Sequence, residues 1–383
     1  MSELLEAARR AGERGEAALH GGGELPETEA ARTALAVLVE EGLVDWTVPH
    51  RYGGRAAGEL APAEDVSVRA LCALRRELAR HSGMLDVMLV MQGLGSYPLA
   101  RAGRPELARS VLPAVARGER IAAFALTEPE AGSDLSRIAT RAERDAAGGG
   151  WRLRGHKTFI SNAGLADFYT VLARTAEGRE DALSMFYVPA DAPGLRVERF
   201  EVMAPHPIGD LHFKDVAVPA EALLGEEGQG LGVALATLGR FRTTVAAAAT
   251  GFARRALQES LARLGAREQF GKPLAAQQGL RFELAEMDVR LRAAELLVDE
   301  AAAAVDGGAP AGETALAVAR AKLFATEAAS WICDRAVQHF GGLGVRRGTV
   351  VERLFREVRA LRIYEGTSEI QKLLIARALL SGE

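Results

Sequence analysis

Apolar residues recur at two different spacings along the chain, and the change of spacing divides it into three stretches. In residues 1–120 they recur every three or four positions, as on one face of a helix. Two clear examples are Thr28–Glu41 and Ala61–Arg80, which end at Gly42 and at Ser82-Gly83, where a helix can terminate. The pattern predicts an N-terminal α-helical domain.

The middle stretch, residues 121–225, has a different pattern. Short alternating or β-branched runs are separated by Gly, Pro and Asp, which is typical of strands joined by turns. We therefore predict a compact β domain here. The predicted strands are Trp151–Leu153, Phe168–Leu172, Leu183–Val188, Leu195–Val202 and Leu211–Val216.

The last stretch, residues 226–383, returns to long Ala- and Leu-rich helical patterns. They are interrupted at Gly265–Pro273, at Asp306–Gly312 and around Gly341–Gly348. Several long helices in succession predict an antiparallel bundle. The whole chain is thus expected to be an α+β protein, mainly α.

Composition sets limits on this picture. A chain of 383 residues with 48% apolar content is long enough for two or three subdomains with sizeable cores, as in a soluble globular protein. The net charge of -4 gives no electrostatic reason to expect nucleic acid or an anionic membrane as a partner.

Cysteine and histidine usage narrows the chemistry further. Two isolated cysteines, Cys72 and Cys333, are too few for a disulfide framework and fit a reducing, cytoplasmic location. The seven histidines show no paired-ligand spacing, so the sequence predicts no metal site. The N-terminus lacks a signal-peptide profile, and no apolar run approaches the roughly 20 residues of a membrane span.

One carboxylate near the C-terminus suggests catalysis. Glu365 stands between Tyr364 and Gly366 in the segment Arg362–Glu369. A base beside a residue without a side chain can meet a substrate at close range. Because Glu and Gly often adjoin in surface turns, this observation needs support from elsewhere in the chain.

Four earlier segments give that support. Phe124–Asp134 is an apolar run that breaks into an acidic turn, and Gly155–Asn162 places Phe159 and Ser161 two residues apart, on the same face of a predicted strand. An aromatic ring beside a hydroxyl suits a flat heterocycle. The other two segments are Arg267–Leu274 with Gln278, and Gln338 with Gly341, Gly342 and Gly344.

Together, in this order, the five segments resemble the acyl-CoA dehydrogenase family. The resemblance extends from about Leu43 to about Leu380, and its most specific parts are Leu126–Asp134, the Arg-x-x-Phe-Gly segment at Arg267 and Tyr364–Thr367. It implies an N-terminal helical domain, a middle β-barrel or β-sandwich domain and a C-terminal four-helix bundle.

The resemblance also implies roles for individual residues. Glu365 would be the catalytic base, and Ser133, Arg242 and Gly366 would contact substrate. Backbone groups of Leu126 and Thr127 and the Ser161 hydroxyl would bond the polar edge of FAD, on whose ring Phe159 would pack. The full set of residues expected to bind FAD is Phe124, Leu126, Thr127, Ser133, Phe159, Ser161, Arg267, Phe270, Gln278, Gln338, Gly342, Thr367 and Glu369.

The implied reaction is α,β-dehydrogenation of an acyl-CoA thioester to the trans-2-enoyl-CoA. Glu365 would take the α-proton and the β-hydride would pass to N5 of FAD. Electron-transfer flavoprotein is the expected acceptor. A homo-oligomer is also expected, a tetramer with a dimer as the minimum, because in the family the segments around Arg267 and Gln338 reach FAD bound mainly by a neighbouring subunit.

Two departures from the family pattern concern the substrate. Gly239 stands where an acid is common, and Met203–Gly209 replaces a Gly- and Ser-containing stretch with a loop that contains two prolines. The family's alternative position for the base is held by Phe241, so Glu365 has no rival there.

Three other functions remain open from the sequence. The first is a dehydrogenase of acyl groups on a phosphopantetheinyl carrier protein in a biosynthetic pathway. The second is a non-catalytic helical interaction protein of the same fold. The third is a flavin oxidase that passes electrons to oxygen, since the sequence does not determine the electron acceptor.

Overall fold

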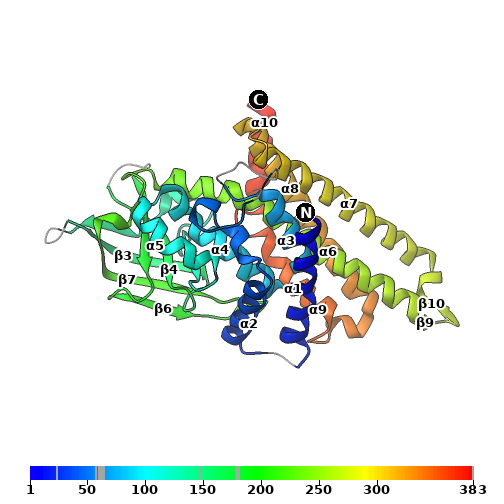
Figure 1. The fold of residues 1–383 in the computed structure, drawn as a ribbon. Coiled ribbons are helices and arrows are strands. Elements are labelled where there is room, and N and C mark those ends of the chain that lie inside the picture. The colour runs from blue at the N-terminus through cyan, green and yellow to red at the C-terminus, as the bar shows by residue number, and fades with distance from the viewer. Residues whose placement is uncertain (23–24, 57, 59–64, 146–148, 177–181, 382–383) are drawn as a thin grey trace. The chain divides into compact units, whose positions relative to one another are not determined.

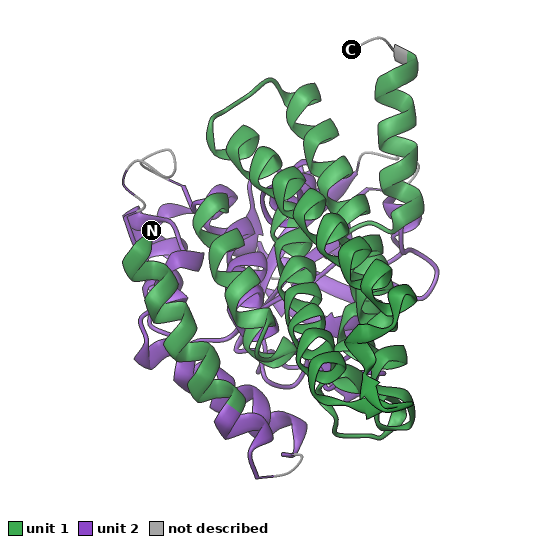
Figure 2. Ribbon diagram, turned by 90° about the vertical axis from the view of Figure 1, so that its right-hand side faces the viewer, with its two compact units in different colours: residues 1–16, 68–86, 242–383 green, residues 17–67, 87–241 purple. Residues whose placement is uncertain are grey.

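A computed structural model describes residues 1–22, 25–56, 58, 65–145, 149–176 and 182–381. These residues form two compact units (Figure 2). Unit 1 comprises residues 1–16, 68–86 and 242–383, and unit 2 comprises residues 17–67 and 87–241. The division into domains 1–120, 121–225 and 226–383 remains a prediction.

Unit 1 is built mainly of helices, labelled in Figure 1. Its core is dominated by small side chains of α6 and α8 that pack with larger apolar residues of α7 and α9. The helices wholly within it are α3 (Val68–Ala79), α7 (Gln278–Asp306), α8 (Ala311–Phe340), α9 (Val350–Arg359) and α10 (Ser368–Ser381). The short elements are the hairpin strands β9 (Glu268–Gln269) and β10 (Lys272–Pro273) and the 3-10 helices η6 (Leu274–Ala276), η7 (Gly341–Val345) and η8 (Ala360–Arg362).

Three helices contribute residues to both units. They are α1 (Ser2–His20), α4 (Gly83–Ala102) and α6 (Gly230–Ala266). Within unit 1, Asp306 at the end of α7 accepts hydrogen bonds from the amides of Val68 (3.0 Å) and Arg69 (2.9 Å) at the start of α3. A carboxylate there satisfies donors that the first helical turn leaves open, and so fixes α3 to α7.

A buried carboxyl on α9 gives unit 1 a pH-dependent stability. Burial raises the pKa of Glu357 from its ordinary 4.5 to about 7, although the Arg353 charge and the Gly83 amide oppose the shift. Between these two values the folded chain binds more protons than the unfolded chain, so stability falls as pH rises.

We therefore expect Glu357→Gln to stabilise the protein by about 2–3 kcal/mol at about pH 8, and by much less near pH 5. Urea unfolding of both proteins at the two pH values measures this difference. An equal effect at both pH values would show that the ionisation of Glu357 is not responsible.

Unit 2 contains helices and a mixed eight-stranded sheet. Its strand order is β6-β7-β3-β2-β4-β5-β8, and β1 pairs parallel with β4. The strands are β1 (Ala122–Ala125), β2 (Arg141–Arg144), β3 (Trp151–Ser161), β4 (Phe168–Arg174), β5 (Leu183–Pro189), β6 (Leu195–Arg199), β7 (Ile208–Val218) and β8 (Leu223–Leu224). The helical elements are α2 (Glu27–Glu40), α5 (Pro105–Ala116), η1 (Val44–Thr47), η2 (His50–Tyr52), η4 (Leu135–Arg137) and η5 (Ala220–Ala222).

The structure confirms the expected fold class, α+β and mainly α. All five strands expected from alternation are present, and β3 extends eight residues beyond the expected Leu153. The strands β1 and β2 were missed because neither alternates, β1 being apolar throughout and β2 mainly charged, and the two-residue strands β8, β9 and β10 were missed as well. The helix expected over Ala61–Arg80 begins at Val68, and residues 61–64 lie outside the described residues.

Among the helices that the structure describes, none combines the length and the apolar character that crossing a bilayer requires.

Candidate active site

The turn that carries Glu365 has an unusual backbone. It lies between η8 and α10, and both Glu365 (φ 52°) and Gly366 (φ 93°) are in the left-handed region. Glutamate rarely adopts this conformation, so surrounding contacts must hold it there. The left-handed backbone at position 366 favours glycine, and a Cβ atom there would also approach the Gln371 side-chain nitrogen to 2.7 Å.

Three side chains hold the turn through its carbonyl groups. Arg242 Nε of α6 donates to the Glu365 carbonyl at 2.8 Å. Lys322 Nζ of α8 and Gln371 Nε2 of α10 donate to the Gly366 carbonyl at 2.8 and 3.1 Å. Three helices thus fix the two consecutive left-handed residues.

The Glu365 carboxyl is left with unused hydrogen-bonding capacity. Its Oε2 atom is buried and has no hydrogen-bond partner among the described residues. Burial raises the pKa of Glu365, and the positive charges of Arg75, Arg242 and Lys322 counteract part of this rise. A buried carboxylate with a free oxygen and nearby cations can act as a general base.

Sequence reasoning missed Lys322 and Arg75, which set the charge around Glu365. Burial lowers the pKa of Lys322 to about 8, and Arg75 is fully buried. The sequence did contain a sign of their burial, because each residue lies on the face of its helix that otherwise carries buried apolar residues. On α8 the buried residues Val318, Ala325 and Ala329 recur at helical spacing around Lys322.

Another group of predicted residues lies at a different end of unit 1. Near the end of α6, the guanidinium of Arg263 lies over the ring of Phe340, the last residue of α8. Next to Phe340, His339 Nε2 lies 2.9 Å from the carboxylate of Glu283, near the start of α7. Five predicted FAD residues gather near these helix ends, and all are exposed. They are Arg267, Phe270, Gln278, Gln338 and Gly342.

This group is far from the Glu365 turn. Arg242, which holds that turn, and Ala266, at the end of α6, are separated by roughly 36 Å of helix at about 1.5 Å per residue. Of the other predicted residues, Thr367 accepts a hydrogen bond from the Ile370 amide at the start of α10, and Glu369 is exposed.

In unit 2, the loop after β1 is fixed by a buried ion pair. Lys157 Nζ donates to Glu128 Oε1 and to the Leu126 carbonyl, both at 2.8 Å. Glu128 also accepts the amides of Ala139 (2.7 Å) and Thr140 (3.0 Å). Burial opposes ionisation of Glu128, but Lys157 and these donors bring its pKa below the ordinary value. Glu128, the first acid of the segment Leu126–Asp134, therefore has a structural role that the sequence did not predict.

The remaining predicted FAD residues of unit 2 lie around β3 and this loop. Phe124 is buried in β1, and the Thr127 carbonyl accepts the Thr158 amide of β3 (2.9 Å). Phe159 is 60% exposed and packs edge-on against Phe200. Ser133, by contrast, is exposed in the turn before η4.

Ser161 is paired with a residue of the proline-containing loop. Its hydroxyl oxygen lies 2.7 Å from Nε2 of His206. Burial lowers the pKa of His206 to about 4, so the imidazole is neutral at ordinary pH. The loop Met203–Gly209, which departs from the family pattern, therefore positions the Ser161 hydroxyl that was predicted to bind FAD.

Comparison with known proteins decides the family. The sequence matches the N-terminal, middle and C-terminal domains of acyl-CoA dehydrogenase over residues 6–119, 123–216 and 228–380. It is 37% identical to cyclohexane-1-carbonyl-CoA dehydrogenase of Geobacter metallireducens, over 90% of this chain and 88% of that protein. The chain belongs to the acyl-CoA dehydrogenase family. As the sequence predicted, it is therefore an FAD-dependent oxidoreductase acting on CH-CH groups.

Solved structures agree with this assignment. Butyryl-CoA dehydrogenase of Megasphaera elsdenii has a TM-score of 0.89 and 31% identity, with 99% of this chain and 97% of that chain covered. A glutaryl-CoA dehydrogenase of Mycobacterium smegmatis in complex with FADH2 has a TM-score of 0.86 and 27% identity, with coverage of 100% and 94%. The expected acyl-CoA dehydrogenase fold is confirmed.

The residues present fit the family's cofactor. Unit 2 offers the exposed aromatic ring of Phe159 and, two residues later in β3, the Ser161 hydroxyl, side-chain types suited to a flavin ring, although the left-handed backbone of Phe159 (φ 55°) interrupts the alternation that predicted a shared face. Unit 1 offers the guanidinium of Arg267 and the ring of Phe270, which is 95% exposed. A guanidinium suits a diphosphate, and a free aromatic face suits an adenine.

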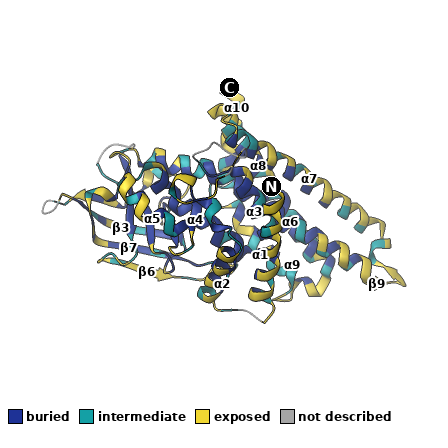
Figure 3. Ribbon diagram, in the orientation of Figure 1, coloured by how far each residue is buried: buried dark blue, intermediate teal, exposed yellow. Residues whose placement is uncertain are grey.

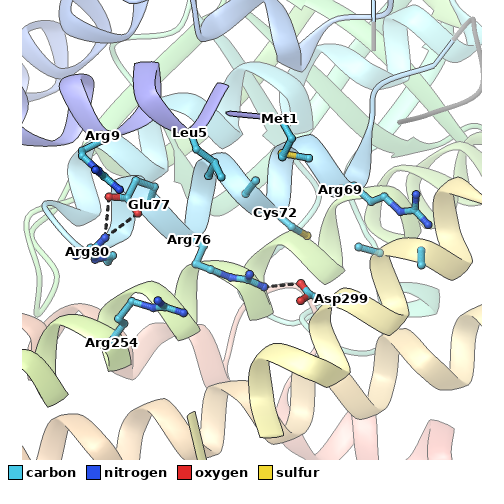
Figure 4. A pocket seen from close by; sticks show the side chains of 13 residues that line it. Met1, Leu5, Arg9, Arg69, Cys72, Arg76, Glu77, Arg80, Arg254 and Asp299 are labelled. Carbon is cyan, nitrogen blue, oxygen red and sulfur yellow. Dashed lines mark hydrogen bonds and ion pairs between the residues drawn. The ribbon is translucent and has the colours of Figure 1, made fainter. Parts of the chain in front are cut away.

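A separate cavity in unit 1 is not part of this site. It has a volume of about 530 Å³, lies beside α3 and contains none of the predicted site residues (Figure 4). Two of its arginines are already paired, Arg76 with Asp299 at 2.7 Å and Arg80 with Glu77 at 2.8 Å. Burial raises the pKa of the Cys72 thiol to about 12, which makes this lining cysteine unreactive.

Proposed function

We propose that this member of the acyl-CoA dehydrogenase family oxidises the Cα–Cβ bond of an acyl-CoA thioester, and that Glu365 removes the α-proton. The observation that carries the proposal is the buried Glu365 carboxyl, with one oxygen unbonded, on a turn held by three helices. Holding the base rigidly before substrate arrives lowers the cost of proton transfer.

The raised pKa of Glu365 suits this role. An α C–H beside a thioester is a weak acid, and a base with a higher pKa accepts its proton more readily. Arg75, Arg242 and Lys322 oppose the shift caused by burial, so the carboxyl can still ionise. Bound FAD supplies the electron sink for the β-hydride.

We further propose a CoA thioester rather than an acyl carrier protein as the substrate. The relatives and solved structures compared above carry the names of CoA substrates, with a ring carboxylate, a short straight chain and a diacid among their acyl groups. A straight-chain or alicyclic acyl-CoA is the class to test first.

Anaerobic titration of the FAD-loaded protein with straight-chain and alicyclic acyl-CoA thioesters tests the reaction and the substrate together. We expect one member to bleach the visible flavin bands and to produce a long-wavelength charge-transfer band. The same acyl group on a carrier protein should react more slowly and bind more weakly. Bleaching by the carrier-bound group alone would favour the carrier-dependent alternative.

The acceptor is proposed to be electron-transfer flavoprotein, the partner implied by the family resemblance. The substrate-reduced protein should be reoxidised slowly by oxygen and rapidly by electron-transfer flavoprotein in a stopped-flow experiment. Rapid reoxidation by oxygen alone would identify a flavin oxidase instead.

We also propose that a second copy of the chain completes the FAD site. The exposed group at Arg267 lies too far along α6 from the Glu365 turn for one extended FAD molecule to reach both within one subunit. Moreover, α7 is exposed along much of its length (Figure 3) and carries a stripe of exposed apolar residues. The stripe residues Phe282 (64%), Val289 (66%) and Leu296 (52%) are seven positions apart and share one helical face.

We expect Val289→Glu to dissociate the oligomer and to lower the FAD content per chain, because it places a charge within this stripe. Sedimentation velocity and the flavin-to-protein absorbance ratio measure the two effects. The matched control is Val39→Glu, at an exposed valine of α2. An unchanged oligomer with Val289→Glu would remove α7 from the interface.

A further inference from the structure

Three side chains that can bind metal meet on one face of the unit 2 sheet. In the antiparallel pair of β3 and β7, His156 lies directly opposite His212. Asp210 is two residues before His212, so its side chain points to the same face. On the other side of β7, the strand β6 places Glu198 opposite Asp210. Strand register thus gathers residues that are more than fifty positions apart in the sequence.

The distances are close to those of a ligand set. His156 Nε2 lies 3.1 Å from Asp210 Oδ2, and the two imidazoles are stacked with centroids 4.3 Å apart. One ligand atom from each of His156, Asp210 and His212 lies within 4.8 Å of the others. Thr158 donates to Asp210 Oδ1 at 2.6 Å, which fixes the carboxylate and leaves Oδ2 toward the histidines.

Each imidazole has one nitrogen that faces a carboxylate without the geometry of a hydrogen bond, His156 Nε2 toward Asp210 and His212 Nε2 toward Glu198. The Nε2 atoms of His156 and His212 are buried, and neither has a hydrogen-bond partner among the described residues. A buried polar atom without a partner is costly, and a bound cation would satisfy both nitrogens at once. Neither histidine is among the residues assigned to FAD or to the thioester, so the reaction does not account for them.

We propose that His156, Asp210 and His212 bind a divalent transition-metal ion, and that Zn²⁺ fits best. Two imidazole nitrogens and one carboxylate oxygen form a known type of zinc ligand set, with a fourth position for water or another carboxylate. Glu198 Oε2 lies 3.6 Å from His212 Nε2 and can supply that fourth ligand. Its present partner is Arg196 at 3.2 Å, an exposed pair that is easily exchanged.

Bound zinc would link β3 to β7 and stabilise unit 2. An ion that binds only the folded chain raises the unfolding temperature by mass action. This inference revises the sequence-based expectation of no metal site, which relied on ligand spacing within short segments. It does not depend on the proposed function, because its test measures metal content and stability rather than turnover.

The experiment uses the FAD-loaded protein with its whole chain of 383 residues, after treatment with a chelator and gel filtration. Titration with Zn²⁺ in a calorimeter should show one ion bound per chain, and metal analysis after a second gel filtration should find it retained. Saturating Zn²⁺ should raise the unfolding midpoint by several degrees. Replacing Zn²⁺ with Co²⁺ should produce ligand-field absorption beyond the flavin bands.

Variants locate the site. We expect His156→Ala and His212→Ala each to weaken Zn²⁺ binding at least about tenfold, and the double variant to abolish both the binding and the rise in midpoint. Asp210→Asn, which keeps an acceptor for Thr158, should weaken binding without loss of fold. The control is His50→Ala, because the exposed His50 lies on η2 and outside the cluster.

Two results would overturn the proposal. One is a wild-type protein that binds no Zn²⁺ under these conditions. The other is binding that persists unchanged in folded Asp210→Asn and in the double histidine variant, which would place the ion elsewhere on the protein.

Discussion

Glu365→Gln is expected to slow reduction of the flavin by acyl-CoA by roughly 10²–10⁴-fold, the usual contribution of a general base. Glutamine has nearly the same shape as glutamate but cannot accept the α-proton. Its backbone can still adopt the turn, because Arg242 and Lys322 hold the carbonyls of Glu365 and Gly366 rather than the carboxyl. FAD content and the oxidised flavin spectrum should therefore stay unchanged.

Single-turnover stopped-flow reduction measures this loss without interference from the acceptor. The matched control is Glu357→Gln, which neutralises another buried carboxyl in unit 1 outside the proposed site. This control should reduce at close to the wild-type rate. If Glu365→Gln reduced as fast as wild type, Glu365 would not be the base.

Asp86→Ala is expected to lower the free energy of unfolding by about 3–5 kcal/mol. Asp86 and Arg75 are both 1% exposed and form a two-pronged pair, with N–O distances of 2.6 and 2.7 Å. Arg75 also donates to Thr244 at 2.8 Å. Removal of Asp86 leaves the guanidinium buried without the carboxylate that pairs with it, and a buried charge that loses its ion-pair partner is strongly destabilising.

Urea unfolding at fixed protein and FAD concentrations measures the loss. Asp299→Asn is a matched control, because it breaks the Arg76–Asp299 pair, whose side chains are 22% and 58% exposed. Such a pair contributes at most about 1 kcal/mol. Equal losses for the two variants would mean that burial does not determine the strength of the Arg75–Asp86 pair.

Replacement of both partners separates stability from catalysis. Arg75→Met with Asp86→Leu should recover much of the lost stability, since apolar residues can fill a buried ion-pair site. The Arg75 charge lowers the pKa of Glu365 more strongly than the Asp86 charge raises it, so removal of both should raise this pKa. The double variant should therefore need a higher pH for flavin reduction, which is measured as an upward shift of the pH–rate profile.

Local pattern was enough to predict most of the elements. Helical spacing predicted α2, α3 and the long C-terminal helices, and alternation predicted β3 to β7, because each pattern is repeated over enough residues to be recognised. Four-residue strands such as β1 gave no such signal. The five motifs also predicted the family, since their order is rarely reproduced by chance.

The sequence alone determined the family, the fold class, the cofactor and Glu365 as the candidate base, because these depend on residue types in a fixed order. Only the tertiary structure decided what surrounds that base and how the sheet is held. In the tertiary structure Lys322 donates to the Gly366 carbonyl, and Glu128 forms an ion pair with Lys157. Strand pairing also places His156 opposite His212. Each of these contacts joins separate elements, and side-chain spacing within one element carries no information about the register or packing of another.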